Sequence, residues 1–288
     1  RLGSALGPAG MKIPPPQHTI AALVDKHHES LQERPRPHLG ASQLGHHCER
    51  WLWLNFRWAI AERFPGRMLR LFRRGQMEED TIIADLEAIG IQFESTQARV
   101  KFGCHVSGSA DGVIREGVPG AEKKRHVAEF KTHNKASFNA LEKKGVKESK
   151  PQHWAQMQVY MLGLGIDRAL YVAICKDDDR LYAERVRLDA DAAQALVEKG
   201  KRIALSERMP PPLSKDPTHW LCKMCAGHAF CHGDAEPERN CRTCAHVVPT
   251  EGSTWLCNMH GNQEIPTDFQ RVGCDEYWQI EDLHKEHR

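Results

Sequence analysis

Hydrophobic and polar positions follow two different periods along the chain, which predict both helices and strands. Apolar residues recur every three or four positions in five segments, and this spacing predicts helices at 42–62, 75–89, 136–147, 151–164 and 190–207. Short apolar runs bounded by glycines and turn residues predict strands at 100–102, 105–114, 126–131, 169–175 and 180–188. Ser42 is the expected N-cap of the first helix, and residues 11–40 are expected to be irregular with one short helix. We therefore predict a mixed α/β (α+β) core followed by a cysteine-rich, metal-binding C-terminal part.

Composition agrees with an ordinary soluble globular protein. The 288 residues include 40 Lys or Arg and 38 Asp or Glu, which gives a formal net charge of +2. Any nucleic-acid surface must therefore come from local clusters of positive charge. No apolar run reaches the roughly 18 residues that a membrane span needs and no signal peptide is visible, so we expect a cytoplasmic protein without a membrane partner. Met11 is the expected natural start, with 1–10 as an expression remnant.

The segment HVAEFKTHN at 126–134 places two charges in the middle of a strand that is otherwise typical of a protein interior. Glu129 and Lys131 are two residues apart, so their side chains share one face of that strand. Such a pair is costly inside a protein unless other groups stabilise it. A divalent metal on the carboxylate and a phosphate or water near the lysine would do so.

Two further acids extend this pair to a constellation. Asp111 ends the preceding strand between two glycines, and Glu79 lies on the helix upstream, with Glu78 beside it as a rival. Carboxylate oxygens are the ligands that Mg²⁺ or Mn²⁺ prefers, so we expect Glu79, Asp111 and Glu129 to hold one or two such ions. Lys131 is then expected to orient or deprotonate the water that attacks a phosphodiester. The alternative is a surface ion pair on an edge strand beside an ordinary turn.

The order of helix acid, strand-end Asp and Glu-x-Lys resembles the PD-(D/E)XK nuclease superfamily. Its RecB-like branch adds a helix with Gln and, four residues on, Tyr; here the helix carries QMQVY, from Gln156 to Tyr160. The resemblance implies a restriction-endonuclease-like core, in which helices flank a central mixed sheet. It also implies Lys131 as the catalytic lysine, the Phe130 carbonyl as an added metal ligand, and supporting roles for Gln156 and Tyr160. A packed core aromatic is the alternative for Tyr160.

Cysteines form two clusters in the second half of the chain, and such clusters favour metal sites over disulfides in a reducing compartment. The first has the spacing Cys222-x2-Cys225-x5-Cys231 and needs a fourth ligand, either Cys48 or a nearby histidine. The histidines within reach are His219, His228 and His232. One early and three late cysteines resemble the iron–sulfur subset of RecB-like nucleases, which includes the AddB subunit and CRISPR-associated RecB-like exonucleases. This implies a [4Fe–4S] cluster that closes a nuclease core over 11–232, with zinc as the alternative metal.

The second cluster consists of Cys241, Cys244, Cys257 and Cys274. Four cysteines that open with a CxxC pair predict a zinc-ribbon-like Zn²⁺ site, so we expect a separate module over 233–288. His260 could replace one of these ligands. Cys104 and Cys175 lie in predicted strands and are expected to be small buried residues.

A basic stretch precedes the predicted acid helix. Its four arginines, expected to contact DNA phosphates, are Arg67, Arg70, Arg73 and Arg74. The alternative is a solvated helix face, which is the usual meaning of a run of charges.

These features together predict a Mg²⁺- or Mn²⁺-dependent DNA exonuclease that hydrolyses phosphodiester bonds from DNA ends in recombination or repair. No phosphate-binding GxxxxGK[ST] loop is present, so we expect no ATP motor. A compact chain of this kind suggests a phage-type enzyme in a bacterial host, working with a single-strand-annealing or recombination protein. The alternatives are a non-catalytic zinc or iron–sulfur nucleic-acid-binding protein and a redox protein.

Overall fold

The computed structural model describes residues 19–287, and these fall into two compact units. The first unit joins residues up to Arg34 with the segment Arg63–Arg74, and the second contains Pro35–Glu62 and Gly75–Arg288. The remnant expected at 1–10 lies outside the described residues. The predicted boundary between 11–232 and 233–288 stays a prediction. In the part of the chain that the structure describes, no helix is long and apolar enough to cross a membrane.

The first unit packs helix α1 (Ile20–Ser30) against the start of α3 (Gly66–Ala88). The first N–H groups of a helix have no partner within the helix. At the start of α3, the backbone N–H of Gly66 instead donates to the side chain of Glu29, at 2.8 Å from Oε1. Asp25 forms an ion pair with Arg70 of α3. An edge-to-face contact between Phe64 and Phe72, with ring centres 5.0 Å apart, adds an apolar contact within the same unit.

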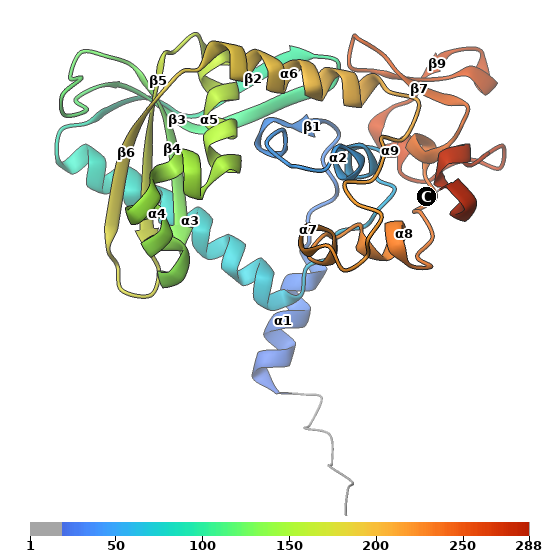
Figure 1. Cartoon of the computed structure of the whole chain (residues 1–288), viewed down its shortest axis with the longest axis horizontal. Coiled ribbons are helices and arrows are strands. Elements are labelled where there is room, and N and C mark those ends of the chain that lie inside the picture. The colour runs from blue at the N-terminus through green and yellow to red at the C-terminus, as the bar shows by residue number, and fades with distance from the viewer. Residues whose placement is uncertain (1–18, 288) are drawn as a thin grey trace, which may run out of the picture. The chain divides into compact units, whose positions relative to one another are not determined.

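A six-stranded mixed sheet forms the centre of the second unit (Figure 1). Its strands are β1 (Leu39–Gly40), β2 (Gln92–Gly103), β3 (Val106–Glu116), β4 (His126–His133), β5 (Arg168–Cys175) and β6 (Leu181–Arg187). They run in the order β1-β3-β4-β5-β6, and β2 also pairs with β3. The β1–β3 and β4–β5 pairs are parallel, while β2–β3, β3–β4 and β5–β6 are antiparallel. The predicted mixed α/β class with a central mixed sheet is confirmed.

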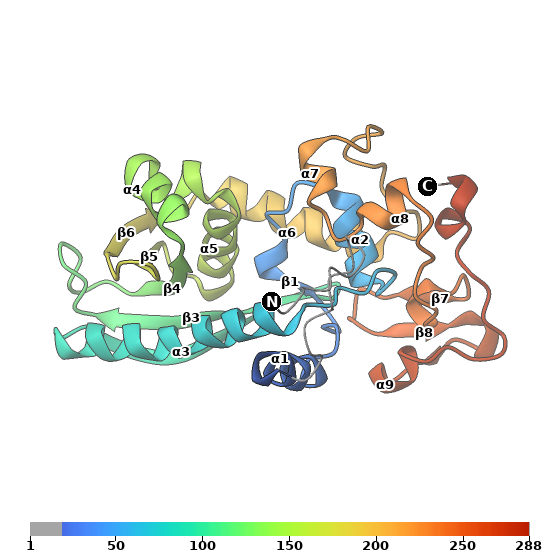
Figure 2. The same ribbon diagram turned by 90° about the horizontal axis from the view of Figure 1, so that it is seen from below.

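Helices cover both faces of this sheet (Figure 2). On one face, Ile82 and Leu86 of α3 pack against Phe130 of β4 in a small apolar cluster. The other face carries four helices, which are α2 (Glu49–Phe56), α4 (Lys135–Ser149), α5 (Pro151–Leu164) and α6 (Ala190–Leu205). Their ends follow the local sequence, because the side chains of Asn134 and Asp189 cap α4 and α6. Gly165 ends α5 in the left-handed conformation.

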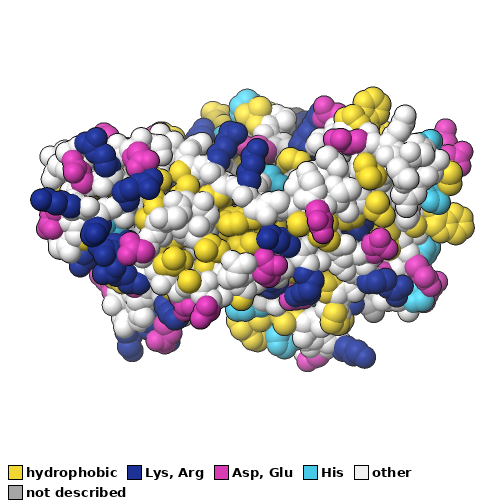
Figure 3. All heavy atoms as spheres, turned by 90° about the horizontal axis from the view of Figure 1, so that it is seen from above, with side chains coloured by type: hydrophobic (Ala, Val, Ile, Leu, Met, Phe, Trp, Pro, Cys, Tyr) yellow, Lys and Arg dark blue, Asp and Glu magenta, His cyan; other side chains and the backbone are white. Residues whose placement is uncertain are grey.

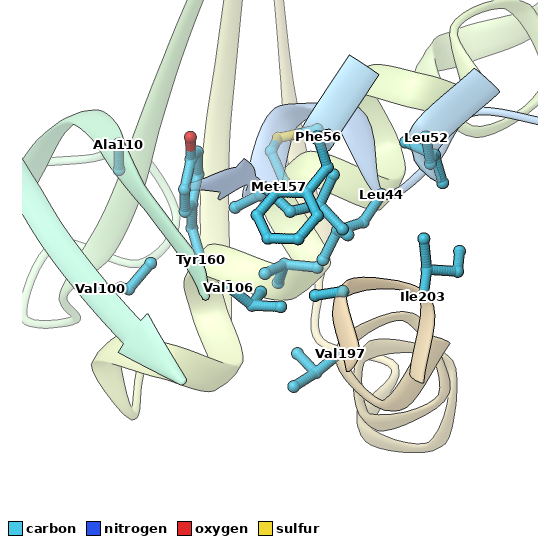
Figure 4. Close-up of a cluster of buried hydrophobic side chains, with 14 of the residues drawn as sticks. Leu44, Leu52, Phe56, Val100, Val106, Ala110, Met157, Tyr160, Val197 and Ile203 are labelled. Atoms are coloured by element: carbon cyan, nitrogen blue, oxygen red, sulfur yellow. The ribbon is translucent and has the colours of Figure 1, made fainter. Parts of the chain in front are cut away.

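The main core lies between these helices and the end of the sheet (Figure 4). Phe56 of α2 and Met157 of α5 are almost completely buried and meet side chains from α6, including Val197 and Ile203. Gly200 lets α6 lie close to Leu44 of the same core, since a Cβ added at Gly200 would lie only 2.7 Å from Leu44 Cδ2. The core therefore joins segments that are far apart in the sequence.

Two predicted helices have different bounds in the structure. The prediction of one helix at 42–62 with Ser42 as N-cap is wrong, because residues 41–43 form a single 3₁₀ turn and Cys48 caps α2 instead. The backbone N–H of Cys48 donates to His46 Nδ1 at 3.1 Å, which replaces a helical hydrogen bond. Helix α3 begins at Gly66 instead of 75, because the arginine-rich stretch consists mostly of good helix formers.

The C-terminal part contains short elements, joined to the core through buried arginines. They are α7 (Trp220–Lys223), α8 (His228–His232), α9 (Thr267–Gln270), and a small sheet of β7 (Val247–Pro249), β8 (Trp255–Cys257) and β9 (Gln263–Glu264). The guanidinium of Arg242 is fully buried and donates to the backbone carbonyls of Phe56 and Pro37, both at 2.9 Å. It also lies 3.6 Å from the ring centre of Trp58. Burial lowers the pKa of Arg242, but a guanidinium remains protonated.

We predict that Arg242→Ala lowers the free energy of unfolding by about 3 kcal/mol or more. The substitution leaves the carbonyls of Phe56 and Pro37 and the side chain of Gln270 without their donor, and each buried unsatisfied group costs about 1–3 kcal/mol. Urea unfolding followed by circular dichroism measures the change. Arg99→Ala, which removes an exposed arginine of β2, is the matched control, and equal midpoints for the two variants would contradict the structural role of Arg242.

Candidate active site

The site forms where strands β3 and β4 stop pairing. Their antiparallel register runs from Ile114 opposite His126 to Gly112 opposite Ala128. Continued by one residue, this register places Asp111 opposite Glu129, so both carboxylates belong on the same side of the sheet. The backbone N–H of Phe130 donates to Asp111 Oδ2 at 2.8 Å. Where β3 and β4 separate, the carboxylate of Asp111 therefore accepts the hydrogen bond that a backbone carbonyl accepts in a continued sheet.

Lys131 and Gln156 complete the contacts around these acids. Lys131 Nζ lies 2.5 Å from Glu129 Oε1 and 3.6 Å from Asp111 Oδ2, and it donates to the Phe130 carbonyl at 2.8 Å. The amide of Gln156, on α5, donates to Glu129 Oε2 at 3.0 Å. The structure thus brings together Asp111, Glu129, the Phe130 carbonyl, Lys131 and Gln156, which the sequence had predicted as one site.

Glu79 on α3 belongs to the same electrostatic environment. It is half-buried, and burial raises its pKa to about 7, with a further contribution from the charge of Asp111 that Lys131 partly opposes. Burial also raises the pKa of the fully buried Glu129 to about 8, although Lys131 acts in the opposite direction. Asp111 and Glu129 thus lie beside one ammonium, and Glu79 lies in the same poorly solvated surroundings. The choice between Glu79 and Glu78 as a ligand stays a prediction.

This donor set fits a hard divalent cation, because it supplies oxygen atoms and an excess of negative charge. Within 19–287, however, no group of three or more His, Cys, Asp or Glu side chains stands in a ready-made metal-binding arrangement. The ammonium of Lys131 lies within 3.6 Å of Asp111 Oδ2 and within 2.5 Å of Glu129 Oε1. The donors are therefore present, but their geometry is that of an ion pair.

For Tyr160 the sequence left two interpretations open, a supporting role at the site and a packed core aromatic. Its side chain is buried in the main core, near Val100 and Ala110 (Figure 4). Gly108 makes room for it, since an added Cβ would lie 2.9 Å from Tyr160 Cε1. Burial raises the pKa of Tyr160, and the charges of Glu129 and Asp111 add to this effect. Tyr160 is thus a core aromatic that lies within electrostatic reach of the acids, and a supporting role for it stays a prediction.

Three residues beside Lys131 were not predicted from the sequence. The hydroxyl of Tyr171 lies 2.8 Å from His133 Nε2 and 2.9 Å from His153 Nδ1. Each has a sequence signal that could have revealed it. His133 follows Glu129 and Lys131 on the same strand face, His153 lies one helical turn before Gln156, and Tyr171 pairs with Glu129 in the β4–β5 register.

Each cysteine set lines a single cavity, and all ten cysteines are free. The cavity of the first set, about 80 Å³, is lined by Cys48, Cys222, Cys225 and Cys231 and also by His228 and His232. The second cavity, about 520 Å³, is lined by Cys241, Cys244, Cys257 and Cys274 and also by His260. Burial raises the pKa of Cys225 and of Cys241, and in each case the other three cysteines of the set contribute. These sets therefore converge in space, although the thiols stand outside metal-binding geometry.

The remaining two cysteines lie apart from these cavities. Cys175 is buried in β5, as expected, whereas Cys104 lies in the turn between β2 and β3 with a positive φ of 46°. The prediction that Cys104 belongs to a strand is therefore wrong.

The four arginines proposed for DNA binding lie on the part of α3 that belongs to the first unit. Arg67, Arg73 and Arg74 are exposed, whereas Arg70 is half-buried and pairs with Asp25. Their contact with DNA stays a prediction. On the face seen in Figure 3, Lys and Arg side chains are interspersed with Asp and Glu, in keeping with the low net charge.

Comparison with known proteins returned structural similarities only. No protein-family model matches the chain, and no curated protein matches it. A solved structure of SSO0001 is 17% identical and covers 76% of this chain and 99% of its own, at a TM-score of 0.45. The alkaline exonuclease LHK-Exo from Laribacter hongkongensis is 17% identical and covers 63% of this chain and 91% of its own, at a TM-score of 0.40. A phage-related exonuclease from Haemophilus somnus 129PT is 16% identical and covers 45% and 66%, at a TM-score of 0.33.

We predict that the affinity for Mn²⁺ rises with pH. Both Glu129 and Glu79 have raised pKa values, of about 8 and about 7, so each binds a proton below that pH and loses it to become a ligand above it. Affinity should increase about tenfold per pH unit for each proton released. Calorimetric titration without DNA between about pH 6 and 9 measures this slope. A Glu129→Gln variant should bind more weakly with a flatter profile, and a pH-independent affinity in the wild type would contradict the prediction.

Proposed function

We propose that this protein is a DNA nuclease of the PD-(D/E)XK type, which hydrolyses phosphodiester bonds with the help of Mg²⁺ or Mn²⁺. The observation that supports this most directly is the meeting of Asp111 and Glu129 where two strands separate, with Lys131 Nζ between them. Raised pKa values cluster at functional sites more often than elsewhere. A non-catalytic DNA-binding protein gains nothing from acids placed where the phosphate would lie, because they repel it.

The residues divide the work as follows. Glu79, Asp111, Glu129 and the Phe130 carbonyl would hold the divalent ion. When bound, that ion would activate water and stabilise negative charge on the phosphate. Lys131 would orient the attacking water and stabilise the charge that develops on the phosphoryl oxygens.

Two supporting contacts set the orientation of the acids. Gln156 Nε2 holds Glu129 Oε2, so that Oε1 faces Lys131. The Phe130 N–H holds Asp111 Oδ2, which leaves Oδ1 for another partner. Fixed carboxylates of this kind bind and orient their partners without a further cost of ordering.

The finer parts of the proposal rest on the resemblance of the motifs. They are an exonuclease that starts at DNA ends, a role in recombination or repair, and phosphate contacts by Arg67, Arg70, Arg73 and Arg74. A phage-type origin, the bacterial cytoplasm as the place of action and a single-strand-annealing or recombination protein as partner belong to the same proposal.

We also propose two structural metal centres. Cys48, Cys222, Cys225 and Cys231 would hold a [4Fe–4S] cluster, and zinc is the second candidate for this site. Cys241, Cys244, Cys257 and Cys274 would hold Zn²⁺. Support comes from the chemistry of the donors, since four free thiols line each cavity and four thiolates suit either metal centre.

We predict that the wild type degrades end-labelled linear DNA in Mg²⁺ or Mn²⁺. Asp111→Asn and Glu129→Gln should each lower the rate by a factor on the order of 100 or more, because each removes a charged metal ligand. The matched control is Asp85→Asn, which neutralises an exposed acid on the same helix as Glu79. Equal cleavage by all variants would place the activity elsewhere. DNA binding without cleavage by the wild type would favour a non-catalytic binding protein, and degradation of closed circular DNA at the same rate would contradict a requirement for ends.

We predict that the protein purified without oxygen contains both iron and zinc. Cys225→Ser should lose iron and keep zinc, and Cys257→Ser should lose zinc and keep iron, because each cysteine lines only one of the two cavities. Elemental analysis measures both metals, and Cys104→Ser, outside both cavities, should change neither. Zinc in both sites of the wild type would contradict the iron–sulfur cluster, and absence of both metals would contradict both centres.

A further inference from the structure

The ammonium of Lys131 lies beside three of the groups that would hold the proposed metal, which are Glu129, the Phe130 carbonyl and Asp111. Its Nζ lies 2.5 Å from Glu129 Oε1, 2.8 Å from the Phe130 carbonyl oxygen and 3.6 Å from Asp111 Oδ2. Apart from this ammonium, Glu129 Oε1 has no hydrogen-bond partner among the described residues. The three oxygens thus converge on one positive group.

A divalent ion and this ammonium cannot share the position. Mg²⁺ and Ca²⁺ lie about 2.0–2.6 Å from their oxygen ligands, which is the space that Nζ fills. The ammonium must therefore move aside before a divalent ion can bind the same groups.

We propose that Lys131 is a resident cation of the metal site and that an incoming divalent ion displaces it. This inference rests on the proposed function, because it takes the metal ligands from there. In the metal-free protein, Lys131 stabilises the charged form of the buried Glu129, which would otherwise be very costly. Binding of the metal transfers that task to the ion and frees the lysine for the phosphate, so that the catalytic lysine becomes available only in the loaded site.

The structure offers the displaced lysine a polar acceptor on the same face of the sheet. Tyr171 pairs with Glu129 in the β4–β5 register, and its hydroxyl is held by His133 and His153. Burial lowers the pKa of His133 to about 4 and of His153 to about 3, so both rings are neutral and do not repel an ammonium. A hydroxyl has one hydrogen and two lone pairs. It therefore donates to one ring, accepts from the other, and keeps one lone pair for Lys131, which makes Tyr171 a positioning residue.

The first test is Mn²⁺ binding without DNA, measured by calorimetry. If most molecules have the ammonium in the site, the apparent affinity is lowered by the fraction in which the site is open. Lys131→Met removes this competition and should bind Mn²⁺ about tenfold more tightly or better. Lys150→Met is the control, because Lys150 is a partly buried lysine near His133 that donates to the carbonyls of Ser137 and Ser149 and does not contact the acids. Lys131→Gln, which keeps a hydrogen-bond donor, serves if the methionine variant does not fold.

A second measurement separates displacement from simple repulsion between two positive charges. Acetylation of Lys131, followed by mass spectrometry, should increase when Mn²⁺ is added, because the amine leaves its carboxylate partners. Tyr171→Phe should weaken Mn²⁺ binding in the wild type and have no effect in the Lys131→Met background, since its role depends on the lysine. A positioning role that is only structural would weaken binding equally in both backgrounds.

The outcomes distinguish this inference from the proposed function. Mn²⁺ binding that Glu129→Gln abolishes, with equal affinity in Lys131→Met and wild type, would overturn the displacement and leave the nuclease proposal standing. Acetylation of Lys131 that stays unchanged or falls when Mn²⁺ is added would also overturn the displacement and leave the nuclease proposal standing. Absence of any Glu129-dependent metal binding in all variants would overturn both.

Discussion

Burial of Glu129 on the central strand is the constraint around which the second unit is organised. The carboxylate is inaccessible to solvent, and an unpaired charge in such a place would neutralise or unfold the surrounding structure. Lys131, on the same strand, supplies the opposite charge, and Gln156 of α5 donates a hydrogen bond. Since a sheet position has neighbours on both sides, β3 must separate from β4 to admit Asp111 and the lysine. The separation of the strands and the chemistry of the site are therefore one feature.

A second buried charge system holds the C-terminal part in place. Arg57 donates to the carbonyls of Arg242 and Ser206, and Arg242 donates to that of Phe56, so that α2 is joined to segments more than a hundred residues later in the sequence. The N-terminal end of α2 carries Cys48, while its C-terminal end contacts the segment between Cys241 and Cys244. One short helix thus connects both cysteine sets, and the arginines provide a rigid link between them.

Periodicity and local motifs were enough to predict much of this arrangement. The bounds of α5 agree with the prediction at 151–164, because Pro151 and Gly165 are strong local signals for its start and end. Glu129 and Lys131 were predicted as a pair because strand periodicity places them on one face, while Asp111 and Glu79 were added from their order along the chain, which resembles a known family. The helix at 42–62 failed because a hydrogen bond from Cys48 to a histidine side chain competes with the helix, which a hydrophobic pattern does not reveal. The His133–Tyr171–His153 group and the burial of Arg242 depend on tertiary contacts, and arginine is among the residues least often buried, so neither follows from local sequence.

The two buried charge systems differ in a way that assigns them different roles. Arg57 and Arg242 are satisfied by backbone carbonyls and aromatic rings, which are neutral and cannot leave. Their positive charge is therefore permanent and their contacts are fixed, as a structural link requires. The site around β4 instead groups three carboxyl groups with one ammonium, and in the proposed exchange a metal ion replaces that ammonium. A site whose cation a single soluble ion could replace is suited to reversible binding, and this physical difference favours Glu129 and Lys131 over the buried arginines as the place of the proposed chemistry.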